Sequence, residues 1–454
     1  MLINTAENNW LGNNIVFYNE KTGKISTNMS EVIDYSNIEI DEEGLWNYFE
    51  FGYSAFGYTI IKNVRYLMPN EGIRRNANGK IELYQLDDPI MKDIHKKSTV
   101  KDTLEYMEYV IAQAAKNTKD DIVLPLSGGY DSRLLAYFIP FAQRDKVKCF
   151  TYGISKKQEE SIEVVNAKYI AEKNNFEWKQ IELKKFFDMI DEWIKIYNVS
   201  VHAHGMYHME FYNQIQRQNI RGSVLSGVIG DLWSGNVEVS MIKSPGDLKM
   251  LGYSHGISIP TKYYKLKCKQ NYREEFFERY RQELLDHDWR IVWVGRIKMM
   301  LLRYLYEIPQ RMGFDTETPF LEYDLCLKML NLPWEEKKNR KWQAEFLEKV
   351  NMQNVKNEHN SIDYANMLDL QCLKNVSLEP LNVNILKDYI SIDFLEKINS
   401  YIYRTPILYR VDKNRILNAG KYFTLWKGYD EKILQALNAY LILIPLQKLL
   451  EKVR

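Results

Sequence analysis

A short apolar run, a glycine-rich turn and an amphipathic segment follow one another at residues 121–139, in the sequence DIVLPLSGGYDSRLLAYFI. The run at 122–126 has the length and residue types of a buried strand. Residues 127–132 are predicted to form a tight loop, and residues 133–139 begin a helix. A strand that leads through a loop into a helix is half of a strand–helix–strand unit, so this stretch predicts a parallel sheet.

The residues that follow repeat the same order of elements. Strand candidates lie at 148–153 and 178–183, with a charged amphipathic helix at 160–174 between them. Strand, helix, strand, helix and strand in succession are typical of a parallel sheet with helices on both faces. We therefore predict an α/β fold.

The chain has 454 residues, enough for two or three domains. We predict a small β-rich domain at 1–95 and an α/β domain at 96–454 whose C-terminal half, after residue 186, is mostly helical. Further predicted elements are a strand at 14–19, helices at 43–51, 100–116 and 340–350, extended structure at 51–75, a polar linker at 87–98, interruptions of the helical pattern at 224–236 and 318–325, and a terminal helix broken at Pro445.

Composition excludes several classes of protein. Lys plus Arg number 61 and Asp plus Glu 60, so the formal net charge is +1 and we expect no nucleic-acid partner. The four cysteines are scattered without a CxxC pair, which favours the reducing cytoplasm over a secreted disulfide framework or a zinc site. The longest apolar run, 440–446, is too short to cross a bilayer, and the first residues lack the pattern of a signal peptide. We expect no transmembrane segment, and a docked terminal helix rather than one that dips into a membrane surface.

The loop Ser127–Ser132 has the residues of an anion site. Its glycines let the backbone approach a ligand, and the backbone N–H groups at the helix start favour negative charge. Asp131 would repel a bare phosphate, so its presence suggests a Mg²⁺ ion that bridges carboxylate and phosphates. Neither the Lys-Ser/Thr ending of a P-loop nor the GxGxxG dinucleotide pattern is present. The simpler alternative is a turn with incidental glycines.

SGGYDS resembles the SGGxDS pyrophosphate loop of the PP-loop ATP pyrophosphatases, and LSGGYDSRLLAY is most similar to the asparagine synthetase branch. The resemblance implies an adenine nucleotide alpha hydrolase-like sheet domain. It also implies that ATP is used to convert a carboxylate to its acyl-adenylate, which an amine then attacks. The hexapeptide alone would also admit GMP synthetase, argininosuccinate synthetase and tRNA-modifying enzymes. By this resemblance the residues that bind ATP and pyrophosphate are Leu126, Ser127, Gly128, Gly129, Asp131 and Ser132.

A second segment, Ser226-Gly227-Val228-Ile229-Gly230-Asp231, resembles the SGxGxDE segment of the same branch. The match implies that Ser226 and Gly227 contact ATP and that Asp231 joins Asp131 as a ligand of Mg²⁺. The structural alternative for Asp231 is a helix cap after a glycine turn. Val228 and Leu232 replace acidic residues of relatives, which indicates a rebuilt acceptor site.

A third segment, residues 309–333, resembles the G-x-E-x-R-x-PFLD…LP segment of the branch. Here Glu322 stands where Asp is usual, Asp315 where Glu is and Glu317 where Arg is. The family also places a catalytic lysine after this region, where positive charge stabilises the charge that develops on the α-phosphate. Lys356 is our candidate, and an exposed, solvated lysine is the alternative.

Three histidines, His202, His204 and His208, cluster in VSVHAHGMYHME. His204 and His208 would share one helix face, which suggests a metal, but no HExxH and no suitably spaced third ligand are present. We predict a place in a substrate pocket or a satisfied surface role instead.

Residues 10–86 resemble the later part of the glutaminase domain of asparagine synthetases, at about half the usual length. The glutaminase nucleophile of relatives is an N-terminal cysteine, whereas this chain starts Met1-Leu2 and has no Cys before Cys149. An N-terminal nucleophile must be Cys, Ser or Thr with a free α-amine. We therefore expect a truncated glutaminase-like domain without glutaminase activity. The nitrogen of the amide product would then come from free ammonia, from a separate glutaminase subunit or from an amine on the substrate.

The sequence predicts an ATP- and Mg²⁺-dependent carbon–nitrogen ligase that forms AMP and amidates a carboxylate such as aspartate, a sugar acid or a peptide carboxylate. Three alternatives stay open. One is a macrolactam-forming enzyme of the β-lactam synthetase or lasso cyclase type. The others are a tRNA-modifying PP-loop enzyme, whose basic face or catalytic cysteines are not evident here, and a non-catalytic ATP-binding relative.

Overall fold

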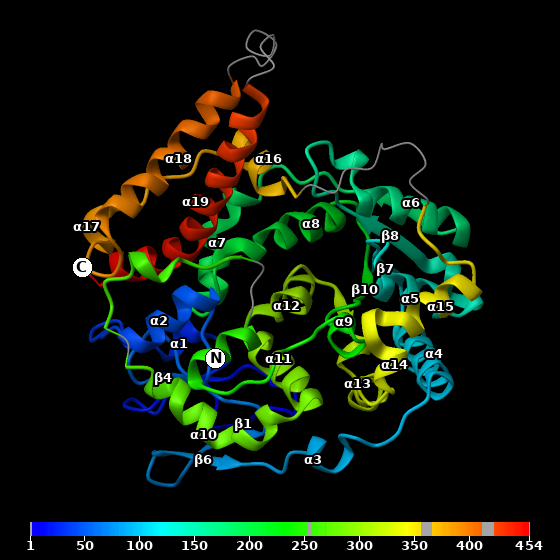
Figure 1. The fold of residues 1–454 in the computed structure, drawn as a ribbon, viewed down its shortest axis with the longest axis horizontal. Helices are drawn as coiled ribbons and strands as arrows, with labels where there is room; N and C mark the ends of the chain where they lie inside the picture. The colour runs from blue at the N-terminus through cyan, green and yellow to red at the C-terminus, as the bar shows by residue number, and fades with distance from the viewer. Residues whose placement is uncertain (1, 253–255, 268, 356–365, 411–421, 454) are drawn as a thin grey trace.

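A five-stranded sheet has the strand order β11-β10-β7-β8-β9. Its strands β7, β8 and β10 lie on the right in Figure 1, beside α5 and α6. Every neighbouring pair in the sheet is parallel. The strands are β7 (Asp121–Pro125), β8 (Val147–Thr151), β9 (Glu177–Gln180), β10 (Gly222–Leu225) and β11 (Asp315–Glu317). The predicted α/β class is confirmed. The computed structural model describes residues 2–252, 256–267, 269–355, 366–410 and 422–453, and the side chains of 404–429 are not described.

The sheet is wider than the sequence predicts. The segments 224–236 and 318–325, expected only as interruptions, adjoin two further parallel strands, β10 and β11. Both strands are short and have no clear apolar run, so local sequence pattern does not predict them. They are identified by pairing: β10 pairs with β7, and β11 pairs with β10.

The helix after the glycine loop starts earlier than predicted. Helix α5 spans Tyr130–Phe138, with Gly129 at its N-cap, so Asp131 and Ser132 lie in its first turn rather than in the loop. Around it stand α4 (Val100–Asn117) and α6 (Ile162–Asn174), which match the helices predicted at 100–116 and 160–174.

The front end contains two three-stranded antiparallel sheets, with orders β1-β5-β6 and β3-β2-β4. Helix α2 (Glu42–Phe51) matches the predicted helix at 43–51, and the predicted linker at 87–98 contains the short helix α3 (Ile90–Asp93). The remaining elements are β1 (Thr5–Glu7), β2 (Phe17–Asn19), β3 (Ile25–Ser26), α1 (Met29–Val32), β4 (Val64–Tyr66), β5 (Glu71–Arg75) and β6 (Ile81–Gln85).

Helices dominate the rest of the described chain. They are α7 (Ile190–Tyr197), α8 (Tyr207–Gln216), α9 (Gly230–Trp233), α10 (Asn271–Leu285), α11 (His287–Leu302), α12 (Tyr304–Arg311), α13 (Tyr323–Leu330), α14 (Trp334–Lys337), α15 (Lys341–Lys349), α16 (Leu368–Asn375), α17 (Val383–Leu386), α18 (Ile392–Arg410) and α19 (Tyr422–Glu451).

The predicted break at Pro445 is wrong, because α19 continues through it. Tertiary packing stabilises the helix on both sides of the proline: the residues around Pro445 are buried, and the Tyr48 hydroxyl of α2 donates to the Ile442 carbonyl at 3.1 Å. Within the described residues one helical stretch, Asp430–Glu451, has the length and apolar composition of a membrane span, and 72% of its most apolar window is buried inside the protein.

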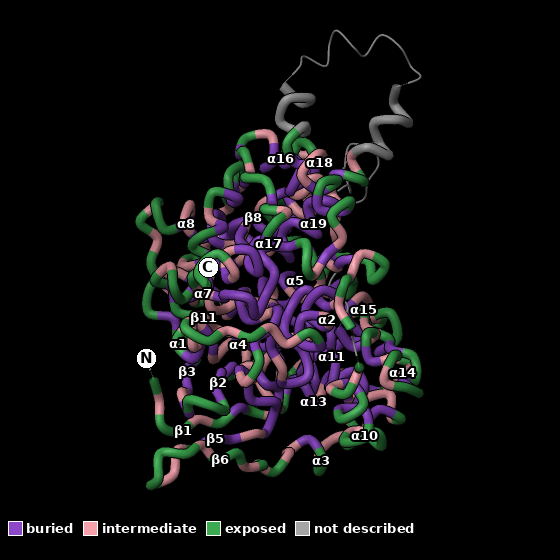
Figure 2. The backbone as a smooth tube through the Cα atoms, turned by 90° about the vertical axis from the view of Figure 1, so that its left-hand side faces the viewer, coloured by how far each residue is buried: buried purple, intermediate pink, exposed green. Residues whose placement is uncertain are grey.

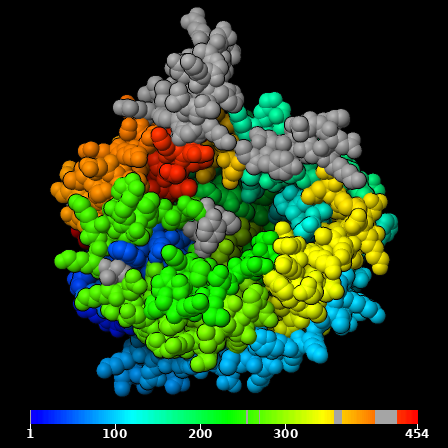
Figure 3. Space-filling model, viewed as in Figure 1, coloured from blue at the N-terminus to red at the C-terminus, as the bar shows by residue number. Residues whose placement is uncertain are grey.

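One large hydrophobic cluster runs through the front end, the sheet and the helical half. Figure 2 shows these buried segments gathered through the interior, around α2, α5 and α11. On the face seen in Figure 3, the light-blue residues near β6 and α3 lie along the lower edge against the green residues of the helical half. There Arg279 of α10 bonds Glu71 at 3.2 Å and Gln85 at 2.6 Å.

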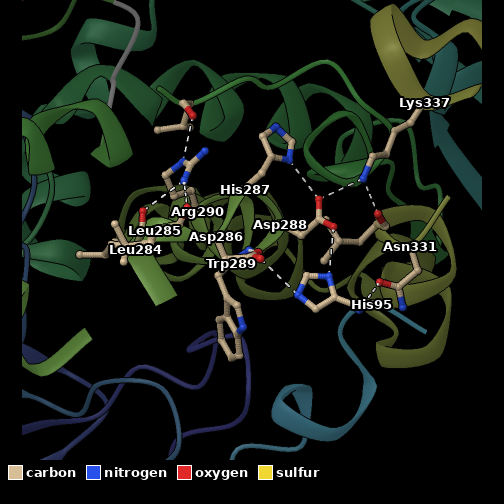
Figure 4. Close-up of polar contacts among 12 residues, drawn as sticks. His95, Leu284, Leu285, Asp286, His287, Asp288, Trp289, Arg290, Asn331 and Lys337 are labelled. Carbon is tan, nitrogen blue, oxygen red and sulfur yellow. Dashed lines mark hydrogen bonds and ion pairs between the residues drawn. The ribbon is translucent and has the colours of Figure 1, made fainter. Parts of the chain in front are cut away.

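A polar cluster joins the segment after α3 to the start of α11 (Figure 4). His95 lies between Asp286 and Asp288, at 3.3 and 3.6 Å, and its backbone N–H donates to Asn331 at 3.0 Å. The Lys337 amine completes the cluster at 3.3 Å from Asp288. These contacts fasten the connection between the front end and the sheet domain onto two helices of the latter.

Candidate active site

A cavity of about 740 Å³ opens at the carboxyl ends of β7, β8 and β10. In parallel sheets ligands bind at this edge, where loops from neighbouring strands meet. The predicted residues that line the cavity are Leu126, Ser127, Gly129, Asp131, Ser132, Ser226, Gly227 and Asp231. Gly128 lies within the same loop but does not line the cavity. Two segments about a hundred residues apart in sequence are thus brought to one site, as the motifs predict.

The loop after β7 is shaped by Gly128 and closed by its own hydroxyl groups. Gly128 has a φ of +70°, and a Cβ there would lie 2.4 Å from the Asn166 Cβ, so only glycine fits. The Ser127 N–H lies 3.3 Å from the Ser132 hydroxyl, and the Gly129 N–H lies 3.3 Å from the Ser127 hydroxyl. The loop leads directly into the N-terminus of α5, where the helix dipole favours an anion.

Asp131 and Asp231 form a pair of acidic residues that line the cavity from the first turns of α5 and α9. Burial and then the nearby Asp231 raise the pKa of Asp131 to about 7, against an opposing effect of Arg340. The Gln343 amide approaches Asp131 at 3.5 Å, and the Asn236 amide approaches Asp231 at 3.3 Å.

This donor set fits a magnesium ion. Mg²⁺ is bound in proteins by one or two carboxylates together with phosphate oxygens and water. Two neighbouring carboxylates that repel each other gain stability from a divalent cation between them. The amides of Gln343 and Asn236 orient one oxygen on each carboxylate and leave the others available.

The turn that carries Asp231 is strained. Ile229, at the N-cap of α9, has a φ of +53°, in the left-handed region that a β-branched residue avoids. Such a conformation costs about 1–3 kcal/mol and is found most often at functional sites. A Cβ on the next residue, Gly230, would lie 2.7–3.0 Å from the Asp131 carboxylate. The turn therefore brings the backbone of one segment against the carboxylate of the other.

Two cationic residues near these carboxylates are not evident from the sequence. Arg340, just before α15, lines the cavity, and its guanidinium lies 4.6 Å from the Tyr130 ring centroid. Lys298 on α11 is partly buried; burial lowers the pKa of its amine, while Asp231 acts in the opposite direction. Arg340 is one of several basic residues in KKNRK, so no local signal distinguishes it. Lys298 is one of several basic residues along α11, with Arg290 and Arg296 before it, so no local signal distinguishes it either.

His202, His204 and His208 line the same cavity. Of the two predicted roles, this position agrees with a place in a substrate pocket. The histidines do not share a helix face: His204 lies in the 3-10 turn Ala203–Met206, and His208 lies in α8. Among the described residues no group of three His, Cys, Asp or Glu side chains is arranged to hold a metal. His204 instead meets Asp369 of α16 at 3.1 Å.

Other predicted residues lie elsewhere. Lys356 lies outside the described residues. The third segment does not line the cavity: it supplies β11, and Glu322 caps α13 by accepting from the Leu325 N–H at 2.7 Å. Glu322 thus has a structural role at the position where relatives carry Asp. Cys149, Cys326 and Cys372 are buried and free.

Comparison with known proteins agrees with the central motifs. Residues 112–235 match the family model described as asparagine synthase. No curated protein matches the chain. Among solved structures, the chain is similar to the NH3-dependent NAD synthetase from Campylobacter jejuni, with 19% identity over 45% of this chain and 95% of that chain and a TM-score of 0.24.

The family match therefore carries the assignment. It includes β7, the glycine loop and the segment Ser226–Asp231, and at the level of the family it supports an ATP-dependent amide ligase. Residues 112–235 are thus similar to an asparagine synthase domain, a domain of the PP-loop ATP pyrophosphatase type.

Proposed function

We propose that the chain is an ATP-dependent, AMP-forming ligase that converts a carboxylate to an amide. The observation that carries this proposal is the approach of Asp131 and Asp231 beside a glycine loop at the N-terminus of α5. A loop that favours phosphate oxygens and a carboxylate pair that requires a cation suit a nucleotide triphosphate with Mg²⁺.

The roles of the residues follow from their positions. Ser127, Gly128, Gly129 and Ser132 bind the β- and γ-phosphates, and Leu126, Ser226 and Gly227 border the nucleoside end. Asp131 and Asp231 hold Mg²⁺, which when bound neutralises charge on the phosphates. Arg340 faces the same cavity and adds positive charge near the leaving pyrophosphate. Lys356 stays our candidate for the lysine at the α-phosphate.

The reaction proceeds in two steps. A carboxylate oxygen attacks the α-phosphorus of ATP, a new O–P bond forms, and the bond to pyrophosphate breaks. An amine nitrogen then attacks the acyl carbon, the C–N bond forms, AMP leaves with the electron pair of the C–O bond, and the amine loses a proton. The protein contributes orientation and fixed positive charge, which are the largest contributions to catalysis in phosphoryl and acyl transfer.

We propose that nitrogen arrives as ammonia, from a separate glutaminase or as a substrate amine, because residues 1–148 contain no cysteine. We place the domain boundary near residue 95, between α3 and α4. Free, buried cysteines are consistent with a cytoplasmic location.

Separation of the nucleotide products tests the proposal. The purified chain is incubated with labelled ATP, Mg²⁺ and an amine, and with aspartate or a sugar acid in separate reactions. We expect AMP and pyrophosphate in equal amounts with at least one carboxylate, and none after chelation of Mg²⁺. ADP with phosphate, or unchanged ATP with every carboxylate, would contradict it.

A further inference from the structure

A second group of side chains lines the same cavity and is not used by the nucleotide chemistry. We call it the histidine–tyrosine group; it consists of His202, His204, Tyr207, His208, Tyr304 and Asp369. Its rings contact one another: Tyr207 and His208 have centroids 4.6 Å apart, and His208 and Tyr304 5.3 Å apart. The hydroxyls of Tyr207 and Tyr304 lie 3.3 Å apart. The group therefore forms a continuous aromatic wall.

Three polar side-chain atoms of this group are buried without a partner: His202 Nε2, His208 Nδ1 and Asp369 Oδ1. Of these, His202 Nε2 is a donor and Asp369 Oδ1 is an acceptor. His202 Nδ1 accepts from the His204 backbone N–H at 3.1 Å, so its proton is on Nε2, which has no partner. Asp369 Oδ2 meets His204 Nε2 at 3.1 Å, and Asp369 Oδ1 has no partner. The residues are only 2% and 8% exposed. Buried polar atoms of this kind require a ligand or water to complete their hydrogen bonds.

The charge of the histidine–tyrosine group limits which ligands can complete these hydrogen bonds. Burial lowers the pKa of His208 to about 3 and that of His202 well below its usual range, so both rings are neutral. Burial opposes charge on His204 as well, but Asp369 outweighs it and raises the pKa of His204. Of the described residues that line the cavity, Arg340 is the single Arg or Lys, and it lies near Asp131. A second carboxylate on the ligand would meet Asp369, and the His204 ring that faces this side chain is already paired with it.

We propose that the histidine–tyrosine group binds a hydroxylated ring of the acceptor, so that the substrate class is a sugar acid rather than an acidic amino acid. A hydroxyl both donates and accepts, which suits a wall that presents an acceptor at Asp369 Oδ1 and a donor at His202 Nε2. The aromatic wall covers the C–H face of the ring. The inference rests on the proposed function for the fate of the sugar carboxylate, which is the group to be adenylated.

Titration calorimetry without ATP tests the ligand class directly. The probes are D-glucuronate, D-galacturonate and D-mannuronate, compared with cyclohexanecarboxylate, which has the ring and the carboxylate but no hydroxyls, and with L-aspartate. We expect at least one uronate to bind ten-fold or more tightly than both comparison compounds. This comparison uses the unmodified chain and does not depend on whether a variant folds. The proposal would be overturned if either comparison compound bound as tightly as the uronates or more tightly. It would also be overturned if no uronate bound.

Variants assign the binding to the group. Asp369→Asn keeps the shape of the side chain but removes its charge, and we expect uronate binding to weaken ten-fold or more. Asp191→Asn makes the same change at a side chain that is 81% exposed and forms a surface ion pair with Lys448. This control should leave uronate binding unchanged. Unchanged binding in Asp369→Asn, with the fold checked by circular dichroism, would contradict the inference.

The two proposals fail in different ways. Uronate binding without pyrophosphate exchange for any carboxylate would contradict the proposed function and leave the ligand class standing. Exchange with aspartate but with no uronate would support the ligase and contradict the sugar-acid inference.

Discussion

At the scale of single residues, the site depends on close approach between two segments. Gly230 has no side chain because the Asp131 carboxylate occupies the space that a Cβ would need, at 2.7–3.0 Å. The Asp131 carboxylate thus packs against the backbone of Gly230, and a methyl group at position 230 would displace it.

Gly230→Ala is expected to lower the rate of ATP turnover at least ten-fold, because displacement of a reacting group by about 1 Å can cost a hundred-fold. Gly246→Ala is the matched control, since a Cβ there meets only the Ser244 hydroxyl at 3.7 Å. Steady-state kinetics of both variants check the prediction. Equal rates in the two variants would show that the approach of Gly230 is not required.

The sequence predicts the residues of this site only where a motif spans them. Ser127 to Asp131 and Ser226 to Asp231 are local patterns, and both lie at the cavity. Arg340 and Asp369 come from distant segments that the fold brings to the same place, and no local spacing distinguishes them from ordinary surface charges.

At the scale of elements, the front end supports one wall of the cavity. The His202 backbone N–H donates to the Gly52 carbonyl at the end of α2, at 2.7 Å, and the Trp193 indole donates to the His202 carbonyl at 3.0 Å. The Ser54 N–H donates to the Ser200 carbonyl at 2.9 Å. The front end is thus tied by backbone hydrogen bonds to the segment that carries His202 and His204.

Gly52→Ala tests this support. Gly52 has a φ of +76°, and a Cβ there would lie 2.6 Å from the His202 ring. We expect weaker acceptor binding, and a lower melting temperature from the backbone strain. Gly79→Ala separates the two effects, because Gly79 has the same φ of +76° with nothing within 4 Å of its Cβ. It should lower stability alone, by about 1 kcal/mol. Acceptor affinity that falls equally in both variants would contradict the role of Gly52.

Local pattern predicts the elements unevenly. Helices α2 and α4 are amphipathic and have side-chain N-caps, so local pattern predicts them, whereas β10 and β11 have only four and three residues. Helix α19 passes Pro445 because its surroundings are buried, which no property of the segment itself reveals. Long-range pairing and burial decide these cases, and sequence periodicity does not encode them.

At the scale of the whole molecule, buried neutral histidines make stability depend on pH. In the unfolded chain His208 gains a proton as the pH falls through its ordinary value near 6.5. In the folded protein burial, and then His204, hold the pKa of His208 at about 3, so the folded state is disfavoured as pH falls below 6.5. His202 acts in the same direction, and His204, with its raised pKa, acts in the opposite one.

The chain should therefore lose more stability between pH 7 and pH 5 than its His208→Gln variant does. The contribution of one such histidine over this interval is about 2 kcal/mol. The tyrosines beside it, Tyr207 and Tyr304, have pKa values raised by burial and stay neutral throughout. Urea unfolding at both pH values measures the difference. Equal losses in the two proteins would mean that His208 is protonated in the folded state.

Exchange of labelled pyrophosphate into ATP tests the central claim most directly, because it reports the reversible adenylation step alone. The assay contains Mg²⁺ and either a sugar acid or aspartate. We predict exchange in the unmodified chain and in the Asp191→Asn control, with a loss of about a hundred-fold in Asp131→Ala and in Asp231→Ala. Unimpaired exchange in either of those two variants would contradict the assignment of the carboxylate pair to Mg²⁺ and the nucleotide.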